Sequence, residues 1–179
     1  EACEASLRRL RVERVDLYQF HAIDPDVRLE ESLGELARLQ REGKIRHVGV
    51  SNFTAAELVR ARRIVNVVSV QNRCNVADRS SDAVLAACER DGIAFIPWSP
   101  LARSPREPSE GPRARLAAWA MGRGVSLAQA AIAWLLARSR AMLPIPGTAD
   151  LAHLEENVAA GSLRLTADDL AEIDGTRNA

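Results

Sequence analysis

The sequence repeats one pattern five times: a short, mostly apolar run ends on polar residues, and a segment with helical spacing follows it. The first run covers residues 15–21 and ends on His21, just before the chain-breaking Asp24-Pro25-Asp26. The later runs cover residues 45–50, 67–70, 94–96 and 142–145. Buried parallel strands are apolar, and each needs a crossover connection to the next. The pattern predicts an α/β fold with a parallel sheet of about five βα units.

The segments between these runs carry helix signals. Leucines spaced by three and four predict a helix over residues 29–42, which Gly43 ends. Thr54 with Glu57 forms a capping box that opens a helix over residues 55–64. Ser126 caps a helix over residues 126–137. Further helices are expected over residues 2–10, 82–90, 114–121 and 150–160 and before residue 175, with a surface loop over residues 103–112.

Composition excludes several classes of protein. The chain has 179 residues, 47% of them hydrophobic, and a formal net charge of +0, which predicts one globular domain and no binding of nucleic acid. No run is long enough for a membrane span. Three scattered cysteines suit buried thiols in a cytoplasmic protein, and Trp119 and Trp134 are expected in the core. Because the chain opens inside a helix, we expect residues 1–179 to be a single domain truncated at its N-terminus.

The polar ends of the five runs are expected to meet at one edge of the sheet, where parallel α/β folds bind ligands. They supply amides, hydroxyls, one aromatic plane and one imidazole, but almost no carboxylate, so no metal site is expected. Such groups suit a neutral amide, a flat ring, and phosphates near helix N-termini. The residues are His21, Ser51, Asn52, Gln71, Asn72, Trp98, Ser99, Gly147 and Thr148.

These motifs, in this order and spacing, resemble the aldo-keto reductase superfamily. The matching runs are Val-Asp-Leu-Tyr-Gln-Phe-His at residues 15–21, Gly-Lys-Ile-Arg-His-Val-Gly-Val-Ser-Asn-Phe at 43–53, Val-Gln-Asn at 70–72, Pro-Trp-Ser-Pro-Leu at 97–101, and Ile-Pro-Gly-Thr at 145–148 with His-Leu-Glu-Glu-Asn at 153–157. The resemblance implies part of a (β/α)₈ TIM barrel. It also implies an NADP(H)-dependent oxidoreductase that reduces small aldehydes and ketones by hydride transfer.

The resemblance also implies a role for each site residue. His21 matches the catalytic histidine, Trp98 matches the aromatic residue that stacks on the nicotinamide, and Ser99 and Leu101 match the pyrophosphate loop. The remaining positions match the carboxamide-binding residues, which are Ser51, Asn52 and Gln71, and the adenosine and 2′-phosphate segment, which is Gly147, Thr148, His153, Glu156 and Asn157. Gly147 and His153 stand where basic residues are frequent in the family, so NAD stays an alternative to NADP.

The family's aspartate, tyrosine and lysine have no counterpart at these strand ends. Tyr18 is the only tyrosine and is expected to face away from His21, and Lys44, the only lysine, starts the second strand at its far end. We therefore expect little turnover by this chain alone, and self-association through open sheet edges. Two alternatives stay open: a nucleotide-binding module of the same fold without catalysis, and an unrelated metal-dependent barrel hydrolase.

Overall fold

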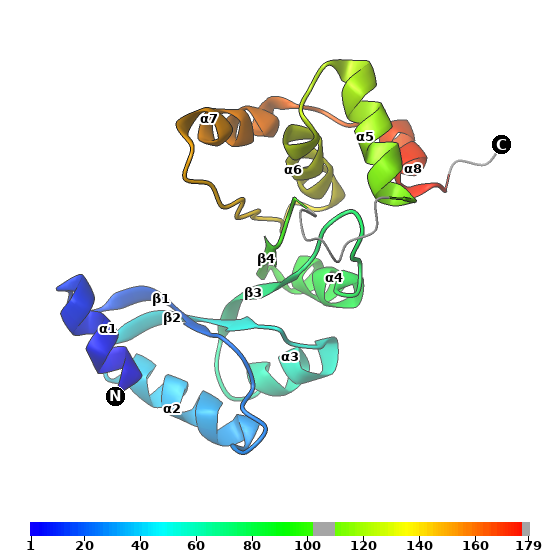
Figure 1. The fold of residues 1–179 in the computed structure, drawn as a ribbon. Coiled ribbons are helices and arrows are strands. Elements are labelled where there is room, and N and C mark those ends of the chain that lie inside the picture. The colour runs from blue at the N-terminus through cyan, green and yellow to red at the C-terminus, as the bar shows by residue number, and fades with distance from the viewer. Residues whose placement is uncertain (102–109, 177–179) are drawn as a thin grey trace. The chain divides into compact units, whose positions relative to one another are not determined.

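The computed structural model describes residues 1–101 and 110–176. Its strands are β1 (Val15–Phe20), β2 (Ile45–Ser51), β3 (Val67–Arg73) and β4 (Ala94–Trp98), as Figure 1 shows. Its helices are α1 (Ala2–Leu10), α2 (Leu29–Arg41), α3 (Ala55–Arg62), α4 (Asp82–Asp91), α5 (Pro112–Arg123), α6 (Leu127–Arg138), α7 (Leu151–Ala159) and α8 (Ala167–Asp174), with the 3-10 turn η1 (Ala160–Ser162).

The chain divides into two compact units, which are described separately. Unit 1 contains Glu1–Gln71 and Ala83–Ala94, and unit 2 contains Asn72–Asp82 and the described residues from Phe95 onward. The single domain expected over residues 1–179 stays a prediction. No single described helix has the length and apolarity to cross a membrane. The pair α5 and α6 meets that test only when joined, and these two helices are bent by 109°.

The sheet is parallel where its register is defined, with strand order β1-β2-β3-β4, which confirms the predicted fold class. In unit 1, Gln19 pairs with Gly49, and Gly49 with Ser69. Side chains alternate between the two faces of a strand, so these three residues form one row on the same face. Two positions further on, Ser51 pairs with Gln71 on that face. We call this face, which carries these five residues, the polar face.

The opposite face of the unit 1 sheet carries buried valines and packs into the core. Val48, Val50 and Val70 there are each 0% exposed. Helices α2 and α3 lie on one side of the strands of unit 1 (Figure 1). The four leucines of α2 predicted to face the core are all buried: Leu29, Leu33, Leu36 and Leu39. This side of the sheet therefore supplies the hydrophobic stabilisation of unit 1.

The helix signals in the sequence are confirmed by the caps. Thr54 accepts a hydrogen bond from the Glu57 backbone N–H, and the Glu57 carboxylate accepts one from the Thr54 N–H, which completes the predicted capping box. Ser126 caps α6 in the same way with Gln129. Gly43 follows α2 with φ of 75°, a left-handed conformation that glycine adopts without strain.

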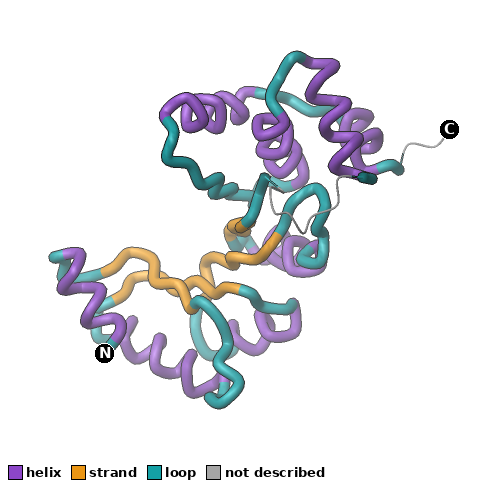
Figure 2. Tube along the Cα trace, in the orientation of Figure 1, coloured by secondary structure: helices purple, strands orange, loops and turns teal. Residues whose placement is uncertain are grey.

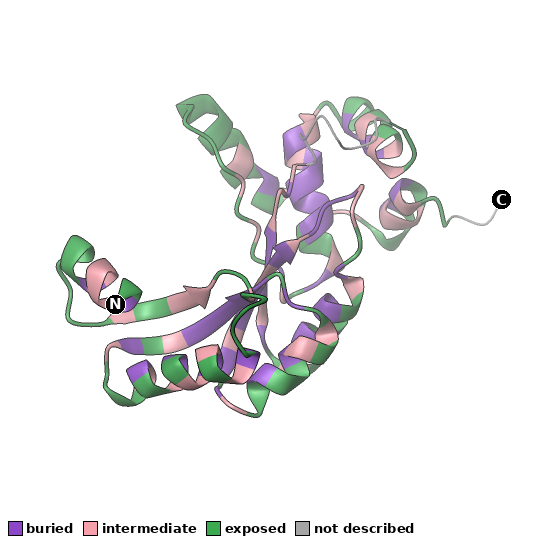
Figure 3. Ribbon diagram, turned by 60° about the horizontal axis from the view of Figure 1, so that its bottom comes forward, coloured by how far each residue is buried: buried purple, intermediate pink, exposed green. Residues whose placement is uncertain are grey.

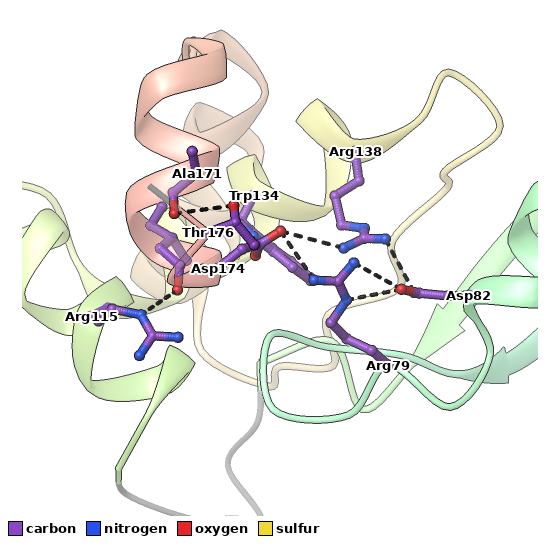
Figure 4. Close-up of polar contacts among 9 residues, drawn as sticks. Arg79, Asp82, Arg115, Trp134, Arg138, Ala171, Asp174 and Thr176 are labelled. Carbon is purple, nitrogen blue, oxygen red and sulfur yellow. Dashed lines mark hydrogen bonds and ion pairs between the residues drawn. The ribbon is translucent and has the colours of Figure 1, made fainter. Parts of the chain in front are cut away.

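Unit 2 packs around two buried tryptophans, Trp119 at 7% and Trp134 at 0% exposure, as predicted. The Trp134 indole N–H donates to the carboxylate of Asp174 at 3.1 Å. Arg79 bridges Asp82 and Asp174, and Arg138 reaches the same two carboxylates (Figure 4). This ion cluster links the start of α4 with the ends of α6 and α8.

The three cysteines, Cys3, Cys74 and Cys88, are buried and free.

Two strand predictions need correction. Residues 142–145 do not form a fifth strand: within the described chain this segment makes one parallel bridge, from Met142 to Phe95, and is otherwise loop (Figure 2). Pro144 and Pro146 lack the N–H that a ladder requires. Strand β3 runs on to Arg73, so Gln71 and Asn72 lie inside it rather than after it. Of the loop expected over residues 103–112, residues 103–109 lie outside the described residues, and Pro112 opens α5.

Candidate functional site

The polar ends of β1, β2 and β3 are joined by hydrogen bonds within unit 1. The backbone carbonyl of Gln71 accepts from the Asn52 backbone N–H at 3.0 Å and from the Ser51 hydroxyl at 2.7 Å. The Asn52 side-chain amide donates to the backbone carbonyl of His21 and to Ser51 Oγ, each at 3.2 Å. Four of the predicted site residues therefore lie together at the carboxyl edge of the sheet. Ser51 is buried, whereas His21 and Asn52 are exposed.

Asn52 holds an unusual backbone conformation, with φ of 60°. Asparagine is one of the few residues other than glycine that enter the left-handed region readily. After this turn the next residue, Phe53, is buried, with 1% exposure. Its ring packs edge to face against the ring of Phe20, with 6.0 Å between the ring centroids. Asn52 is thereby held between a buried serine and a buried aromatic residue, while its own side chain stays at the surface.

Strand β4 of unit 2 ends in a second left-handed turn, with Ser99 at φ of 54°. The residues that leave β3 hold this turn from one side. The Asn75 side-chain amide donates to the Ser99 carbonyl at 3.0 Å, and the Cys74 N–H donates to the Trp98 carbonyl at 3.4 Å. Trp98, Ser99 and Leu101 are each only partly buried. Asn75, at 0% exposure, was missed by the sequence reasoning.

The segment expected to bind adenosine and the 2′-phosphate starts α7 of unit 2. Gly147, Thr148, His153 and Glu156 are exposed there, as is most of α7 (Figure 3). Asn157 is partly buried and lines an apolar hollow of about 350 Å³ with residues of α6 and the α6–α7 loop. Asn157 therefore lines a concave surface.

The chain itself satisfies donors at the start of α7. The Asp150 carboxylate accepts from the His153 backbone N–H at 3.1 Å, and the Thr148 hydroxyl accepts from the Asp150 N–H at 3.1 Å. The backbone hydrogen bond from His153 lowers the pKa of the Asp150 carboxyl, and the charge of that histidine adds to the effect. The start of α7 therefore carries the negative charge of the Asp150 carboxylate, which repels a phosphate at the same place.

The only lysine and the only tyrosine lie in unit 1. Lys44 forms ion pairs with Glu4 and Glu42, and these hydrogen bonds raise the pKa of the lysine. It precedes β2, at the opposite end of the strand from Ser51. Tyr18 pairs with Val48, whose side chain is in the apolar core, so strand alternation directs Tyr18 away from the polar face. That orientation agrees with the sequence reasoning.

The twelve predicted site residues are divided between the units, with His21, Ser51, Asn52 and Gln71 in unit 1 and the other eight in unit 2. Within the described ranges, no three His, Cys, Asp or Glu side chains are grouped as metal ligands.

Burial raises the pKa of both Cys74 and Cys88 to about 11, which keeps these thiols protonated and unreactive at neutral pH.

Comparison with known proteins gives a consistent result. The model of the aldo/keto reductase family matches residues 1–178. An uncharacterised oxidoreductase of Schizosaccharomyces pombe is 44% identical over 169 residues, which cover 94% of this chain and 54% of that protein. Pyridoxine 4-dehydrogenase of Escherichia coli is 37% identical over 182 residues, 98% of this chain and 62% of the relative.

A solved structure agrees with the sequence relatives. The aldo/keto reductase of Klebsiella pneumoniae, in complex with NADP and acetate, matches with a TM-score of 0.84 and 30% identity. The match covers 98% of this chain and 63% of that one. The chain thus spans between about half and two thirds of the length of these three proteins.

Proposed function

The chain belongs to the aldo/keto reductase family, and from this premise we propose that it forms the dinucleotide-binding part of an NADP(H)-dependent oxidoreductase that reduces small carbonyl compounds. The observation that carries the proposal is the linked set His21, Ser51, Asn52 and Gln71 at the ends of three parallel strands. The related Klebsiella enzyme holds NADP in its structure. Ligands of parallel α/β folds bind at this edge of the sheet.

The donor set of the chain fits the nicotinamide end of the cofactor. A carboxamide has one acceptor and one donor group, and we propose that the amide side chains of Asn52 and Gln71 pair with it, while buried Ser51 positions Asn52 through their hydrogen bond. Trp98 of unit 2 is only partly buried, unlike the two core tryptophans, and is the aromatic residue that we propose for stacking. Bound NADPH supplies the hydride for the carbonyl carbon. The role of the chain is to hold the nicotinamide, while His21 orients the carbonyl oxygen.

The adenosine end fits less well. In our proposal Ser99 and Leu101 flank the pyrophosphate, and Thr148, His153, Glu156 and Asn157 receive the adenosine, with Gly147 at the turn. The Asp150 carboxylate at the start of α7 weakens the preference for a 2′-phosphate. We therefore propose NADP as the cofactor, with NAD as a competitor that this chain excludes only weakly.

A second candidate function is a nucleotide-binding module without catalysis. Lys44, paired with two glutamates, and Tyr18, on the apolar side of β1, support it, because neither side chain joins His21. Reduction needs a group that protonates the forming alkoxide. We propose that this chain alone binds the cofactor without measurable turnover, and that it stays in the cytoplasm and self-associates through its sheet edges.

The test is a titration of the purified chain with NADPH, followed by quenching of tryptophan fluorescence. We expect saturable binding that Asn52→Gly weakens about tenfold, because glycine keeps the left-handed backbone and removes only the amide. Asn66→Gly, at an exposed position before β3, is the matched control and should bind like the unmodified chain. No binding by the unmodified chain would contradict the proposed function. Aldehyde-dependent oxidation of NADPH by the pure chain would rule out the non-catalytic module.

A further inference from the structure

Helix α7 carries an exposed apolar stripe. Leu151, Leu154 and Val158 are spaced by three and four residues, so they share one face of the helix. Their exposed fractions are 70%, 49% and 72%, and none of the nine residues of α7 is buried (Figure 3). Single exposed apolar residues are ordinary, but a contiguous apolar patch is typical of an interaction surface. We call these three residues the α7 stripe.

The charge beside the α7 stripe is negative. Residues 150–158 contain three carboxylates and no lysine or arginine. Glu155 follows Leu151 by four positions, so its exposed carboxylate lies at the edge of the stripe. A surface that fits the α7 stripe therefore combines apolar side chains with positive charge.

The end of α1, in unit 1, has this combination. Residues 8–14 are all exposed and contain four arginines and one glutamate. Leu10 and Val12 lie among these arginines with exposed fractions of 60% and 44%. Arg8, Arg11 and Val12 also line a shallow hollow of about 520 Å³. We call residues 8–14 the basic end of α1.

The two surfaces complement each other in charge, and both have apolar side chains to bury. Every copy of the chain carries both of them, so a second copy supplies the partner that each surface needs. We propose that the α7 stripe of one chain docks on the basic end of α1 of a second copy, with Glu155 facing the arginines. Such a contact joins two unlike surfaces, so it links copies head to tail. It is independent of the proposed cofactor site, because none of these residues belongs to that site.

Sedimentation velocity of the purified chain over a range of concentrations tests the proposal. We expect the mean sedimentation coefficient to rise with concentration, and to rise less in about 1 M than in about 0.1 M NaCl, because salt screens exposed charge pairs. Glu155→Arg and Arg11→Asp should each weaken the Kd of association about tenfold. Aspartate tolerates the left-handed backbone that Arg11 adopts, with φ of 56°. Leu151→Gln, which keeps the size but not the apolar character, should weaken the Kd about fivefold.

Mixing the two charge variants tests the pairing itself. In an equimolar mixture of Glu155→Arg and Arg11→Asp, each changed surface meets an opposite charge on the other variant, so most of the association should return. The matched control is Glu89→Arg, at an exposed position of α4 outside both surfaces, which should associate like the unmodified chain. Far-UV circular dichroism of each variant checks that the fold is kept.

Three results would overturn the inference. The first is an unmodified chain that stays monomeric at every concentration. The second is association that both charge variants leave unchanged, because copies would then meet through other surfaces, such as the sheet edges. The third is weakened association that mixing does not restore. If a variant does not fold, the salt series decides, and association that is equally strong at both NaCl concentrations overturns the inference.

Discussion

Gly49 is the position where a single added methyl group tests the packing of the sheet. It lies on the polar face of β2, between Gln19 of β1 and Ser69 of β3. A Cβ atom at Gly49 would lie 2.1 Å from Gln19 Oε1 and 2.3 Å from Ser69 Oγ. Non-bonded atoms prefer separations near ~3.5 Å, so both neighbours would have to move by roughly 1 Å.

We expect Gly49→Ala to destabilise the chain by about 2 kcal/mol, within the ~1–3 kcal/mol that overpacking costs. Ser69 is 2% exposed, so its hydroxyl has to shift within the interior of the chain. For a chain of this length, that change lowers Tm by roughly 4–8 °C. Thermal unfolding followed by far-UV circular dichroism measures it. Adding Gln19→Ala removes one of the two clashes and should recover part of the loss.

Gly34→Ala is the control of opposite sign. Gly34 lies inside α2, and nothing is within 4 Å of its added Cβ. Alanine in a helix interior is more stable than glycine by roughly 0.5–1 kcal/mol, so Tm should rise by about 1–4 °C. A Gly49→Ala variant with unchanged or higher Tm would refute the reasoning, because the row Gln19, Gly49 and Ser69 would then have room that the register does not provide.

Three further predictions concern single side chains. The Trp119 indole N–H donates to Asp169 at 2.8 Å, and this hydrogen bond, followed by contacts from Thr166 and Arg123, holds the pKa of the Asp169 carboxyl below its usual value. The carboxylate therefore stabilises the fold above about pH 4, and this stabilisation is lost as pH falls through the lowered pKa. Between about pH 2 and 6, the free energy of unfolding in urea should depend less on pH in Asp169→Asn than in the unmodified chain. Asp150→Asn keeps the α7 cap and removes its charge, so binding titrations should give NADPH a roughly threefold gain over NADH; an equal gain for both cofactors would contradict this. Ser126→Ala removes the α6 cap and should cost about 1 kcal/mol in urea unfolding, whereas alanine at the exposed Ser162 should cost almost nothing.

The fold was largely predictable because local signals and burial agree. The leucines of α2 and the capping residues Thr54 and Ser126 place helix ends within one or two residues of those observed. The end of β3 was misplaced, because backbone pairing continues to Arg73 whatever the polarity of the side chains. The fifth strand was overpredicted, because an apolar run at residues 142–145 also contains proline.

The candidate site was predictable as a set of strand ends but not as a set of contacts. The sequence order placed Ser51 and Asn52 at the end of a strand, and hydrogen bonds do link them there. Asn75 and Arg73 escaped notice because their partners, Ser99 and Trp98, lie about 25 residues away along the chain. The local signal was the turn in which the Asn75 side chain accepts from the Ala77 and Asp78 backbone N–H groups.

The two faces of the unit 1 sheet have separate roles. The valines on one face are buried in the core, whereas the polar face carries amides and hydroxyls. Substitutions that retune ligand preference then fall in one layer and those that threaten folding fall in the other. New ligand specificities can therefore accumulate through substitutions on the polar face while the valine face is kept. Gly49 is the exception, because it lies on the polar face and a larger side chain there would disturb the packing of the sheet.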